Sequence, residues 1–264
     1  MRLNVSNLDI EVNNVTVKFG GLIALNDITL TFNHNQVIGL LGPNGSGKTT
    51  LFNSITGVYK VSDGHINFAD KDLCQLTPQD IFRLGITRTF QRSRLSLDLT
   101  VFDNIAIGRH AHLNNGLFSV VFKRHLFLKE FNETVLKIRT LMELFCPHLI
   151  EQLNKPVNQL SMIDRRRIEI CRALIAEPKV LLLDEPSAGM THDETHELME
   201  DVLIAKKNLG DITIVLIEHE MSVIKKITER CLVLSYGKLI ADDTYDNIIK
   251  NYEVQKAYLG EEVA

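Results

Sequence analysis

The pattern of apolar and polar residues predicts a sheet whose strands alternate with helices. Three continuous apolar runs are QVIGLL at 36–41, KVLLLD at 179–184 and ITIVLI at 212–217. Runs of this length predict strands buried on both faces, whereas ITLTF at 28–32 alternates apolar and polar residues as a half-exposed strand does. Because helical segments separate the buried runs, we expect a parallel sheet covered by helices.

The remaining elements add a mainly helical lobe to this α/β pattern. A helix is predicted from about Lys48 to Gly57, and another begins at Pro78. From about 100 to 158 the strand signals disappear and apolar residues recur every three or four positions, as in amphipathic helices. The last predicted elements are two strands and a helix, at 231–236, 238–241 and near 244–259.

Composition excludes several classes of protein. The 264 residues are 45% hydrophobic and 23% charged with a net charge of −4, which is typical of a soluble globular protein. The negative charge argues against a nucleic-acid binder that works through overall charge. No segment approaches the ~20 apolar residues needed to span a bilayer, and MRLNVSNLDIEV lacks the apolar core of a signal peptide. If the protein works at a membrane, we expect another chain to cross it.

The cysteines favour a reducing compartment over a zinc site or a disulfide framework. They are scattered along the chain without a CxxC pair. Apolar neighbours predict buried thiols at two of them, Cys171 and Cys231. The four cysteines are Cys74, Cys146, Cys171 and Cys231.

The segment GPNGSGKT at 42–49 has the composition of a phosphate-binding loop. It fits G-x-x-x-x-G-K followed by Ser or Thr, and it lies between a predicted strand and a predicted helix. The glycines let backbone N–H groups approach phosphate oxygens. Lys48 is expected to reach the β- and γ-phosphates of a nucleotide and Thr49 to bind Mg²⁺. The candidate nucleotide-binding residues are Gly42, Pro43, Asn44, Gly45, Ser46, Gly47, Lys48, Thr49 and Thr50.

Polar residues follow two of the buried strands. Asp184 and Glu185 end VLLLDE, and His219 stands in IEHE at 217–220. The carboxyl ends of parallel strands are where ligands bind in such sheets. We therefore expect Asp184 to hold Mg²⁺, Glu185 to accept a proton from an attacking water, and His219 to contact the γ-phosphate.

With these motifs in place, the chain resembles the nucleotide-binding subunit of an ABC transporter over about residues 10–260. GPNGSGKT looks like Walker A, and VLLLDEP at 180–186 looks like Walker B with its catalytic glutamate. The resemblance implies that Gln91, the last residue of the Q-loop-like TRTFQ, contacts Mg²⁺ and water. The other matching motifs are SAGM at 187–190, in the place of the D-loop, and IEH at 217–219, with the switch histidine.

Phe19 has two possible roles. It precedes Gly20-Gly21 and falls at the position where the family stacks an aromatic ring on adenine, a contact that needs only a π-face. Phe19 also alternates with Val15 and Val17, so that a place in the core remains the alternative.

The resemblance implies a single ABC ATPase domain over 1–264. Its expected fold is an α/β P-loop NTPase core with a parallel sheet, a small antiparallel β region and a helical subdomain at about 92–176 inserted in the RecA-like core. Within the family the chain looks most like the larger of the two ATPases of branched-chain amino acid importers, which implies import of branched-chain amino acids or related small polar solutes. ATPases of the relatives that carry urea or amides look much alike. This closer similarity depends on TRTFQ, GRH at 108–110 and its following helical insertion, IEHEM at 217–221, YGKLIA at 236–241 and AYLG at 257–260.

This similarity also implies cofactors, partners and a location. The expected cofactors are ATP and Mg²⁺. The expected partners are a second ABC ATPase subunit, membrane-embedded permease subunits and, indirectly, a solute-binding protein, with no nucleic acid. The chain would then lie peripherally on the cytoplasmic face of the cell membrane.

The stretch LSMIDRRR at 160–167 departs from the family signature, LSGGQ or LSYGQ. Met162, Ile163 and Asp164 replace the residues that follow the kept Leu and Ser. In the family the signature acts in trans on the ATP of the other subunit, so Ser161 would face a partner's nucleotide. Ile163 crowds that approach, and the Asp164 charge costs up to ~4 kcal/mol beside a phosphate. We therefore expect one competent site, built from these Walker motifs and a partner's normal signature.

The residues that follow Leu160 predict how the helix starts and which of its faces is buried. Ser161 and Asp164 predict a capping box, and Arg165 and Glu169 predict an i,i+4 pair on a solvated arginine face. The alternative for the arginines is contact with a partner's nucleotide or a neighbouring loop. The predicted buried stripe consists of Ile168, Cys171, Leu174 and Ile175.

Two other patterns suggest a metal site or a nucleic-acid site, but we interpret both differently. HDETH at 192–196 nearly spells a zinc-protease motif, but the glutamate is displaced by one residue, so we expect a solvated helix start. A cluster of arginines around the Q-loop-like segment is expected to dock a membrane partner or to be solvated. Its members are Arg83, Arg88, Arg92 and Arg94.

Two functional alternatives remain open. The first is a soluble ABC ATPase of DNA repair or translation, although the single P-loop and the absence of long coiled-coil insertions speak against it. The second is a nucleotide-binding regulatory subunit with little hydrolysis, which the altered signature favours and the intact Glu185 opposes.

Overall fold

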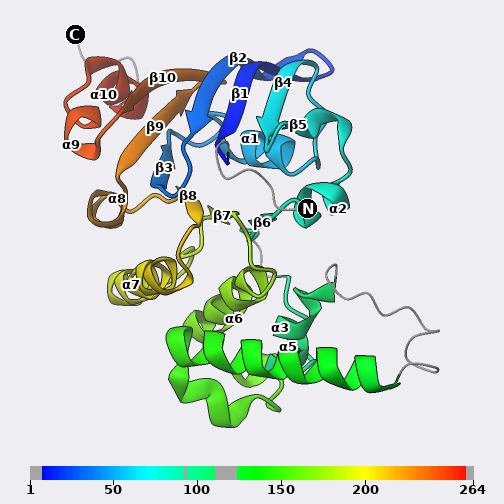
Figure 1. Ribbon diagram of the computed structural model, residues 1–264. Helices are drawn as coiled ribbons and strands as arrows, with labels where there is room; N and C mark the ends of the chain where they lie inside the picture. Colours follow the sequence, from blue (N-terminus) through cyan, green and yellow to red (C-terminus); the bar gives the residue numbers. More distant parts are fainter. Residues whose placement is uncertain (1–7, 92–93, 111–123, 260–264) are drawn as a thin grey trace. The chain divides into compact units, whose positions relative to one another are not determined.

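The computed structural model describes residues 8–91, 94–110 and 124–259 (Figure 1). The chain divides into two compact units. The first unit comprises residues 1–88, 179–186 and 211–264, and the second comprises 89–178 and 187–210. Each unit is therefore built from segments that are far apart in the sequence.

The larger sheet of the first unit has six strands, all parallel except the edge strand β10. Every residue of β3, β7 and β8 is buried, because both faces of these central strands are covered. The three apolar runs therefore form the strands predicted for them. In sheet order the strands are β10 (Lys238–Asp243), β9 (Arg230–Ser235), β3 (Val37–Leu41), β8 (Thr213–Ile217), β7 (Val180–Asp184) and β6 (Ile86–Arg88).

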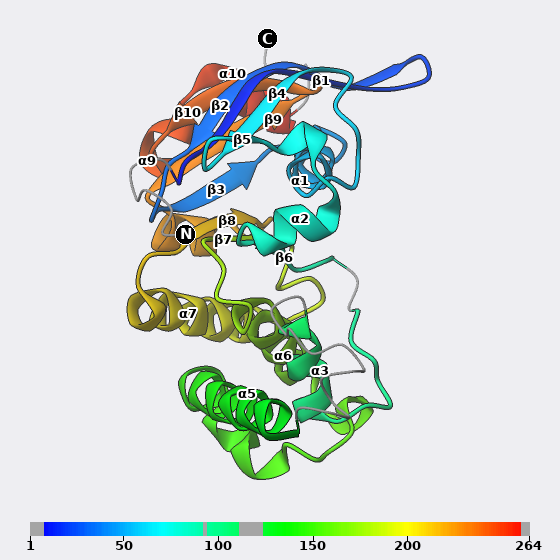
Figure 2. The same cartoon turned by 45° about the vertical axis from the view of Figure 1, so that its right-hand side comes forward.

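The second sheet of this unit is antiparallel and has four strands in the order β2-β1-β4-β5 (Figure 2). Along β1 the side chains of Val15 and Val17 are buried and their neighbours are more exposed, as the alternating pattern requires. The strands are β1 (Ile10–Phe19), β2 (Leu22–Phe32), β4 (Asp63–Phe68) and β5 (Lys71–Asp72). The predicted α/β fold with a mostly parallel sheet and an antiparallel β region is confirmed.

One hydrophobic core joins the two sheets through helix α1 (Lys48–Ile55). Leu51, Phe52 and Ile55 of this helix are fully buried, and side chains from both sheets pack in the same cluster. This core fixes the beginning of α1, and with it the loop that precedes the helix. The other helices of the unit are α2 (Pro78–Arg83), α8 (Met221–Ile227), α9 (Tyr245–Ile248) and α10 (Tyr252–Leu259), with a 3₁₀ turn at Leu73–Gln75.

The single helix predicted near 244–259 is wrong, because the chain forms α9 and α10 separately. Asn251 lies between them, and its Oδ1 accepts hydrogen bonds from the N–H groups of Glu253 and Val254 at 2.9 and 3.3 Å. An asparagine side chain at this position caps a new helix instead of continuing the previous one.

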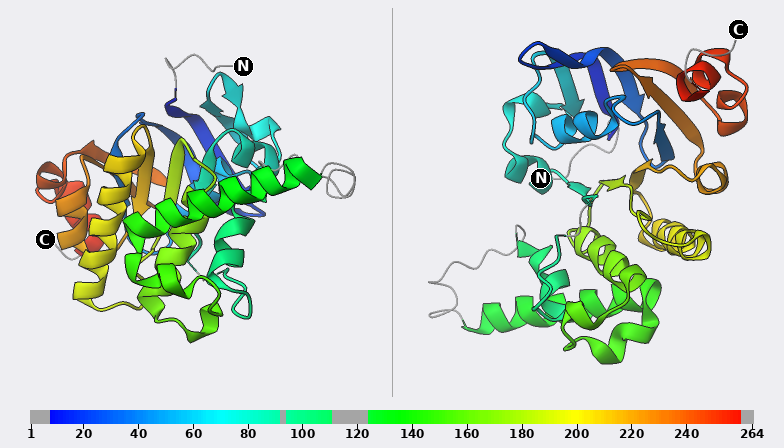
Figure 3. Two further views of the ribbon diagram at one scale, coloured as in Figure 1. Left: turned by 60° about the horizontal axis from the view of Figure 1, so that its bottom comes forward. Right: turned by 180° about the vertical axis from the view of Figure 1, so that it is seen from behind.

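In the second unit, the described residues are helical or irregular apart from an isolated bridge between Thr100 and Pro156. Helix α6 packs against α3, α5 and α7 (Figure 3). No described helix of the chain is long and apolar enough to cross a membrane. The helices are α3 (Val101–Ile107), α5 (Arg124–Phe145), α6 (Met162–Leu174) and α7 (His192–Leu209), with 3₁₀ turns at Pro147–Gln152 and Val157–Gln159.

Candidate nucleotide-binding site

Residues 42–49, called the P-loop from here on, connect β3 to α1. Gly42, Gly45 and Gly47 have φ angles of 139°, 80° and 109°, which residues with a Cβ rarely adopt. Gly47 precedes α1, and no side chain caps this helix start. Uncapped N–H groups at a helix N-terminus, together with its positive dipole end, suit an anion such as a phosphate.

The P-loop lies close to two other segments of the first unit. A Cβ on Gly47 would come within 2.7 Å of Leu25 Cδ2, and one on Gly42 within 2.1 Å of the Leu234 carbonyl oxygen. Glycine is therefore required at these positions for packing as well as for backbone conformation. Of the other predicted loop residues, Ser46 is buried, Pro43 and Thr50 are half-buried, and Asn44 and Thr49 are exposed.

Lys48 places a buried ammonium group inside the P-loop. Its Nζ donates hydrogen bonds to the carbonyl oxygens of Gly42 and Pro43 at 2.7 and 3.0 Å. Burial lowers the pKa of Lys48, and the charges of Glu185 and Asp184 oppose this shift without reversing it. An ammonium group held by carbonyl oxygens can exchange them for phosphate oxygens when a nucleotide enters.

The carboxyl ends of β7 and β8 bring the predicted acids and histidine together. Asp184 pairs in register with Ile217, and the Glu185 N–H donates to the Ile217 carbonyl at 2.9 Å. His219 Nε2 lies 2.9 Å from Glu185 Oε1. Glu185 has a φ of 47°, a left-handed conformation that is uncommon for a residue with a side chain. Asp184 and Glu185 interact electrostatically with Lys48, and His219 joins this polar cluster through its contact with Glu185.

Arg88 is a member of this cluster that sequence reasoning missed. Its Nη2 lies 2.5 Å from Asp184 Oδ2, and the two side chains are only 5% and 1% exposed. Its Nη1 donates to Asn53 Oδ1 at 2.6 Å, and the guanidinium lies 5.5 Å from the Phe52 ring centroid. Burial raises the pKa of Asp184, and the hydrogen bond and charge of Arg88 limit this rise.

The predicted arginine cluster is therefore not a single surface patch. The Arg88 side chain is buried, because the edge strand β6 pairs with β7 and brings this arginine beside Asp184. Arg83 is exposed and pairs with Asp80 on α2 at 3.3 Å. Arg92 lies outside the described residues. The β-branched pair Ile86-Thr87, which begins β6 just before Arg88, is the only local signal that could have placed this arginine on a strand.

Phe19 is not part of the core. Its side chain is 44% exposed, whereas Val15 and Val17 on the same strand are fully buried. The ring packs edge-on against Tyr59 with centroids 5.0 Å apart. Of the two roles considered for Phe19, the structure excludes the core alternative.

Gln91 and Ser161 belong to the second unit, unlike the P-loop and the strand-end acids. The Gln91 carbonyl accepts a hydrogen bond from Arg166 Nη2 at 2.8 Å. Ser161 is the N-cap of α6, and its Oγ accepts from the Asp164 N–H at 3.2 Å. The reciprocal half of the predicted capping box is absent from α6, where Asp164 Oδ2 accepts from the Ser161 hydroxyl at 2.7 Å.

The Asp164 carboxylate is enclosed by donors. Besides Ser161, it accepts from His148 Nε2 at 2.8 Å and lies 3.4 Å from Arg167 Nη1. Burial favours a higher pKa for Asp164, but the hydrogen bonds from Ser161 and His148 and the charges of His148 and Arg167 lower the pKa below its ordinary value. Donors of the second unit therefore stabilise the Asp164 carboxylate, with Arg167 shared between it, Glu197 and Asp201.

The solvated arginine face predicted for α6 is wrong. Arg166 and Arg167 are 6% and 5% exposed, and Arg166 forms a 2.7 Å ion pair with Glu169. The predicted Arg165–Glu169 pair does not form, since Arg165 Nη2 donates to the Asn158 carbonyl. The apolar stripe predicted for this helix is buried as expected. Acids from α7 explain the burial of Arg167, which lies 2.5 Å from Glu197 and 2.8 Å from Asp201.

The HDETH segment forms the helix start that was predicted for it. Thr191 and Glu194 make a capping box at the beginning of α7. The rings of His192 and His196 contact each other edge-on with centroids 4.4 Å apart. Adjacent turns of one helix bring the two rings together, as residues four apart share a face.

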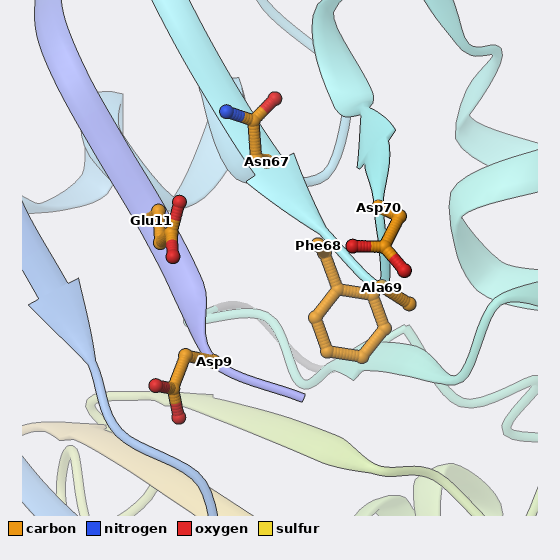
Figure 4. A pocket seen from close by; sticks show the side chains of 6 residues that line it. All are labelled: Asp9, Glu11, Asn67, Phe68, Ala69 and Asp70. Atoms are coloured by element: carbon orange, nitrogen blue, oxygen red, sulfur yellow. The ribbon is translucent and has the colours of Figure 1, made fainter. Parts of the chain in front are cut away.

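A separate pocket of about 320 Å³ lies near the start of β1 and the β4–β5 turn (Figure 4). Its lining includes Asp9, Glu11 and Asp70. Asp9 Oδ1 accepts a hydrogen bond from the His34 N–H at 2.6 Å. Three carboxylates repel an anionic nucleotide, so this pocket is not an alternative to the P-loop.

Known proteins share both the sequence and the fold of this chain. The family model of the ABC transporter matches residues 25–188, a range that contains the P-loop, Asp184 and Glu185. The high-affinity branched-chain amino acid transport ATP-binding protein LivG of Escherichia coli (strain K12) is 40% identical over 253 residues, 96% of this chain and 98% of the relative. The corresponding protein BraF of Pseudomonas aeruginosa is 37% identical over 253 residues, with the same coverage of both chains.

Solved structures agree with the sequence relatives. A nucleotide-free ATP-binding cassette from an ABC transporter has a TM-score of 0.81 and 29% identity, and the match covers 95% of this chain and 98% of that one. An ATP-binding cassette of an ABC transporter in its ADP conformation also has a TM-score of 0.81, with 30% identity and the same coverage. The chain therefore belongs to the ABC transporter family, as one of its ATP-binding cassette ATPases.

Proposed function

We propose that this ATPase powers an importer of branched-chain amino acids. The observation that carries the proposal is the similarity to LivG, which extends over 96% of this chain at 40% identity. The relatives from Salmonella typhimurium and Pseudomonas aeruginosa have the same function in their names. The solute class is thus inferred from the relatives, whereas the P-loop and the strand-end acids support the ATPase chemistry.

We assign Mg²⁺ to oxygen atoms at the P-loop edge of the sheet. Asp184 supplies a buried carboxylate, and the Thr49 hydroxyl stands at the beginning of α1. Such hard oxygen donors suit Mg²⁺, which usually keeps several waters and binds one or two carboxylates with the phosphates. When bound, the ion neutralises charge on the phosphate oxygens. Gln91 of the second unit is the further proposed ligand.

Glu185 is the proposed general base for hydrolysis. It accepts a proton from water as the water oxygen attacks the γ-phosphorus and the bond to the β-phosphate oxygen of ADP breaks. His219 contacts Glu185 Oε1 at 2.9 Å and can hold this carboxylate while its own ring faces the γ-phosphate. Lys48 stabilises the charge that develops on the phosphate oxygens. Phe19, exposed beside Tyr59, offers a ring face to the adenine.

The altered signature supports an asymmetric pair of ATPases. The Ser161 hydroxyl donates to Asp164 Oδ2 and accepts from the Asp164 N–H, so its only O–H donor is used within α6. Ile163 is buried in this helix start, where the family signature has glycine. We therefore propose a heterodimer in which the P-loop of this chain works with a partner's normal signature. Because donors of its own unit hold Asp164, the missing glycine and the engaged Ser161 donor are the main proposed defects.

Three kinds of partner follow from this proposal. Permease subunits supply the membrane crossing, the second ATPase supplies a signature, and a solute-binding protein delivers the amino acid. The chain itself then works peripherally, on the cytoplasmic face of the membrane.

Transport in reconstituted vesicles tests the proposal. The wild-type complex should take up labelled leucine with ATP, and Glu185→Gln should abolish uptake while ATP still binds. Glu177→Gln is the matched control, because Glu177 forms an exposed pair with Lys137 in the second unit. ATP-dependent uptake of amides or urea instead of leucine would overturn the solute class. Failure to co-purify with any membrane protein would favour a soluble ATPase, and full uptake by Glu185→Gln would favour a regulatory role.

Restoring the signature tests the asymmetry separately. The double variant Ile163→Gly with Asp164→Gln should increase the ATPase activity of this chain in the absence of its partner subunit. Equal activity of the variant and the wild-type chain would contradict the asymmetric pair. Rapid hydrolysis by the wild-type chain alone would contradict it as well.

A further inference from the structure

Tyr258 reaches the P-loop from near the opposite end of the chain. Its hydroxyl accepts a hydrogen bond from the Gly42 N–H at 2.8 Å, although the two residues are 216 positions apart. The Tyr258 side chain is 40% exposed, yet desolvation raises the pKa of its hydroxyl despite the opposing effect of this hydrogen bond. Tyr258 is therefore a fixed acceptor for an amide at the beginning of the nucleotide-binding loop.

Gly42 connects this tyrosine to the ammonium group of the site. The Gly42 N–H contacts Tyr258, and its carbonyl accepts from Lys48 Nζ at 2.7 Å. Gly42 has a φ of 139°, which is accessible because glycine lacks a Cβ. The same freedom would let the two flanking peptide groups rotate. The Tyr258 hydroxyl restrains the peptide group that carries the Gly42 N–H. It thereby limits where the Gly42 carbonyl, which accepts from Lys48, can lie.

Helix α10 carries Tyr258 and has its own anchors in the first unit. Val254 is buried, and the Asn251 side chain caps the start of the helix. A groove of about 360 Å³ remains between α10 and the β9–β10 hairpin, lined by residues of both. The groove shows that α10 is not closely packed along its whole length. The hydrogen bond from the Gly42 N–H to the Tyr258 hydroxyl therefore couples the position of α10 to the P-loop.

The P-loop has a second support that does not depend on Tyr258. The Gly237 N–H in the β9–β10 turn donates to the Ser46 carbonyl at 3.0 Å, and the Gly237 carbonyl accepts from the Asn26 N–H at 2.8 Å. These backbone contacts remain when the tyrosine hydroxyl is removed. We therefore expect the loop to stay folded in a Tyr258→Phe variant while Gly42 gains freedom.

We propose that Tyr258 is a positioning residue for ATP binding. Its hydroxyl holds the Gly42 peptide, and through Gly42 it holds Lys48, in the arrangement that receives the phosphates. A loop that is ordered before binding loses less conformational freedom when the nucleotide enters. Since the proposal concerns the ATP-binding loop of the cassette, it does not depend on which solute the transporter carries.

The test compares three variants by titration of the full-length chain with ATP, with and without Mg²⁺. Tyr258→Phe removes only the hydroxyl and should weaken ATP binding about two- to tenfold, the effect of one neutral hydrogen bond. Tyr258→Ala should weaken ATP binding at least as much. Tyr252→Phe is the matched control: this tyrosine of the same helix is 58% exposed, and the variant should bind ATP like the wild type.

Steady-state kinetics of the assembled complex separate positioning from stability. Tyr258→Phe should raise KM for ATP by a similar factor and leave kcat near the wild-type value, because the loop is normal once ATP is bound. A lower kcat with unchanged KM would show loss of folded protein and overturn the proposal. Wild-type affinity in Tyr258→Phe with weak binding in Tyr258→Ala would assign the effect to the ring and also overturn it.

Discussion

Arg88 and Asp184 form an ion pair inside the first unit, with Nη2 and Oδ2 2.5 Å apart and both side chains almost fully buried. The arginine also contacts Asn53 and lies over Phe52, so that it joins β7 to the helix that follows the P-loop. An acid proposed to hold Mg²⁺ is thus already compensated by a cation of the protein. Charge balance at this edge of the sheet does not depend on the nucleotide alone.

Arg88→Met should destabilise the protein strongly. Removing one partner of a buried ion pair leaves an uncompensated charge, which typically costs about 3–5 kcal/mol. Urea unfolding without nucleotide measures this loss. The double variant Arg88→Met with Asp184→Asn should recover part of the lost unfolding free energy, because no buried charge is then left unpaired. Arg83→Met is the control, since its pair with Asp80 is exposed and contributes about 0–1 kcal/mol. Equal effects of the two single substitutions would contradict the buried pair.

Lys48→Ala should weaken ATP binding without unfolding the chain. The loss of charge-assisted hydrogen bonds to phosphate corresponds to roughly a 10- to 100-fold decrease in affinity. Titration with a fluorescent ATP analogue measures this change. Lys71→Ala, at an exposed position of β5, should leave affinity unchanged. An undiminished affinity in Lys48→Ala would show that the nucleotide does not bind at the P-loop.

Gly42→Ala should be much more harmful than Gly21→Ala. The new Cβ at position 42 would lie 2.1 Å from the Leu234 carbonyl oxygen, at a φ that alanine rarely adopts. We expect a loss of at least about 1–3 kcal/mol in the free energy of unfolding. A methyl group on Gly21 would meet no heavy atom within 4 Å apart from its chain neighbours, so this substitution should be nearly neutral. Similar unfolding midpoints for the two variants would be inconsistent with the observed close approach.

The Asp164 cluster predicts a pH-dependent contribution to stability. The folded pKa of Asp164 is lower than the unfolded value of about 3.9, so the carboxylate stabilises the fold above that pH. This contribution is lost as the pH falls through the folded pKa. The difference in unfolding free energy between the wild type and Asp164→Asn should therefore be largest near pH 6 and shrink below about pH 4. Urea unfolding at several pH values tests this, and a difference that grows with acidity would refute it.

The sequence by itself determined the fold class and the P-loop. Continuous apolar runs can be satisfied only by strands covered on both faces, and a glycine-rich turn between strand and helix has a distinctive local composition. The meeting of Asp184, Glu185 and His219 at one edge was also predicted from sequence, because the ends of parallel strands lie at one edge by topology. Phe19 needed the structure, since its alternation with Val15 fits a core position equally well.

The tertiary structure alone decided which charges are buried and which distant residues meet. The sequence around Arg88, Arg166 and Arg167 resembles a solvated surface, yet acids from other elements or from the next turn compensate all three. The contact of Tyr258 with Gly42 links α10 to the P-loop across almost the whole chain. Hydrophobic periodicity is a local property and can be read from neighbouring residues. The partner of a buried charge or of a backbone amide is set by how separate elements pack, and no local pattern encodes it.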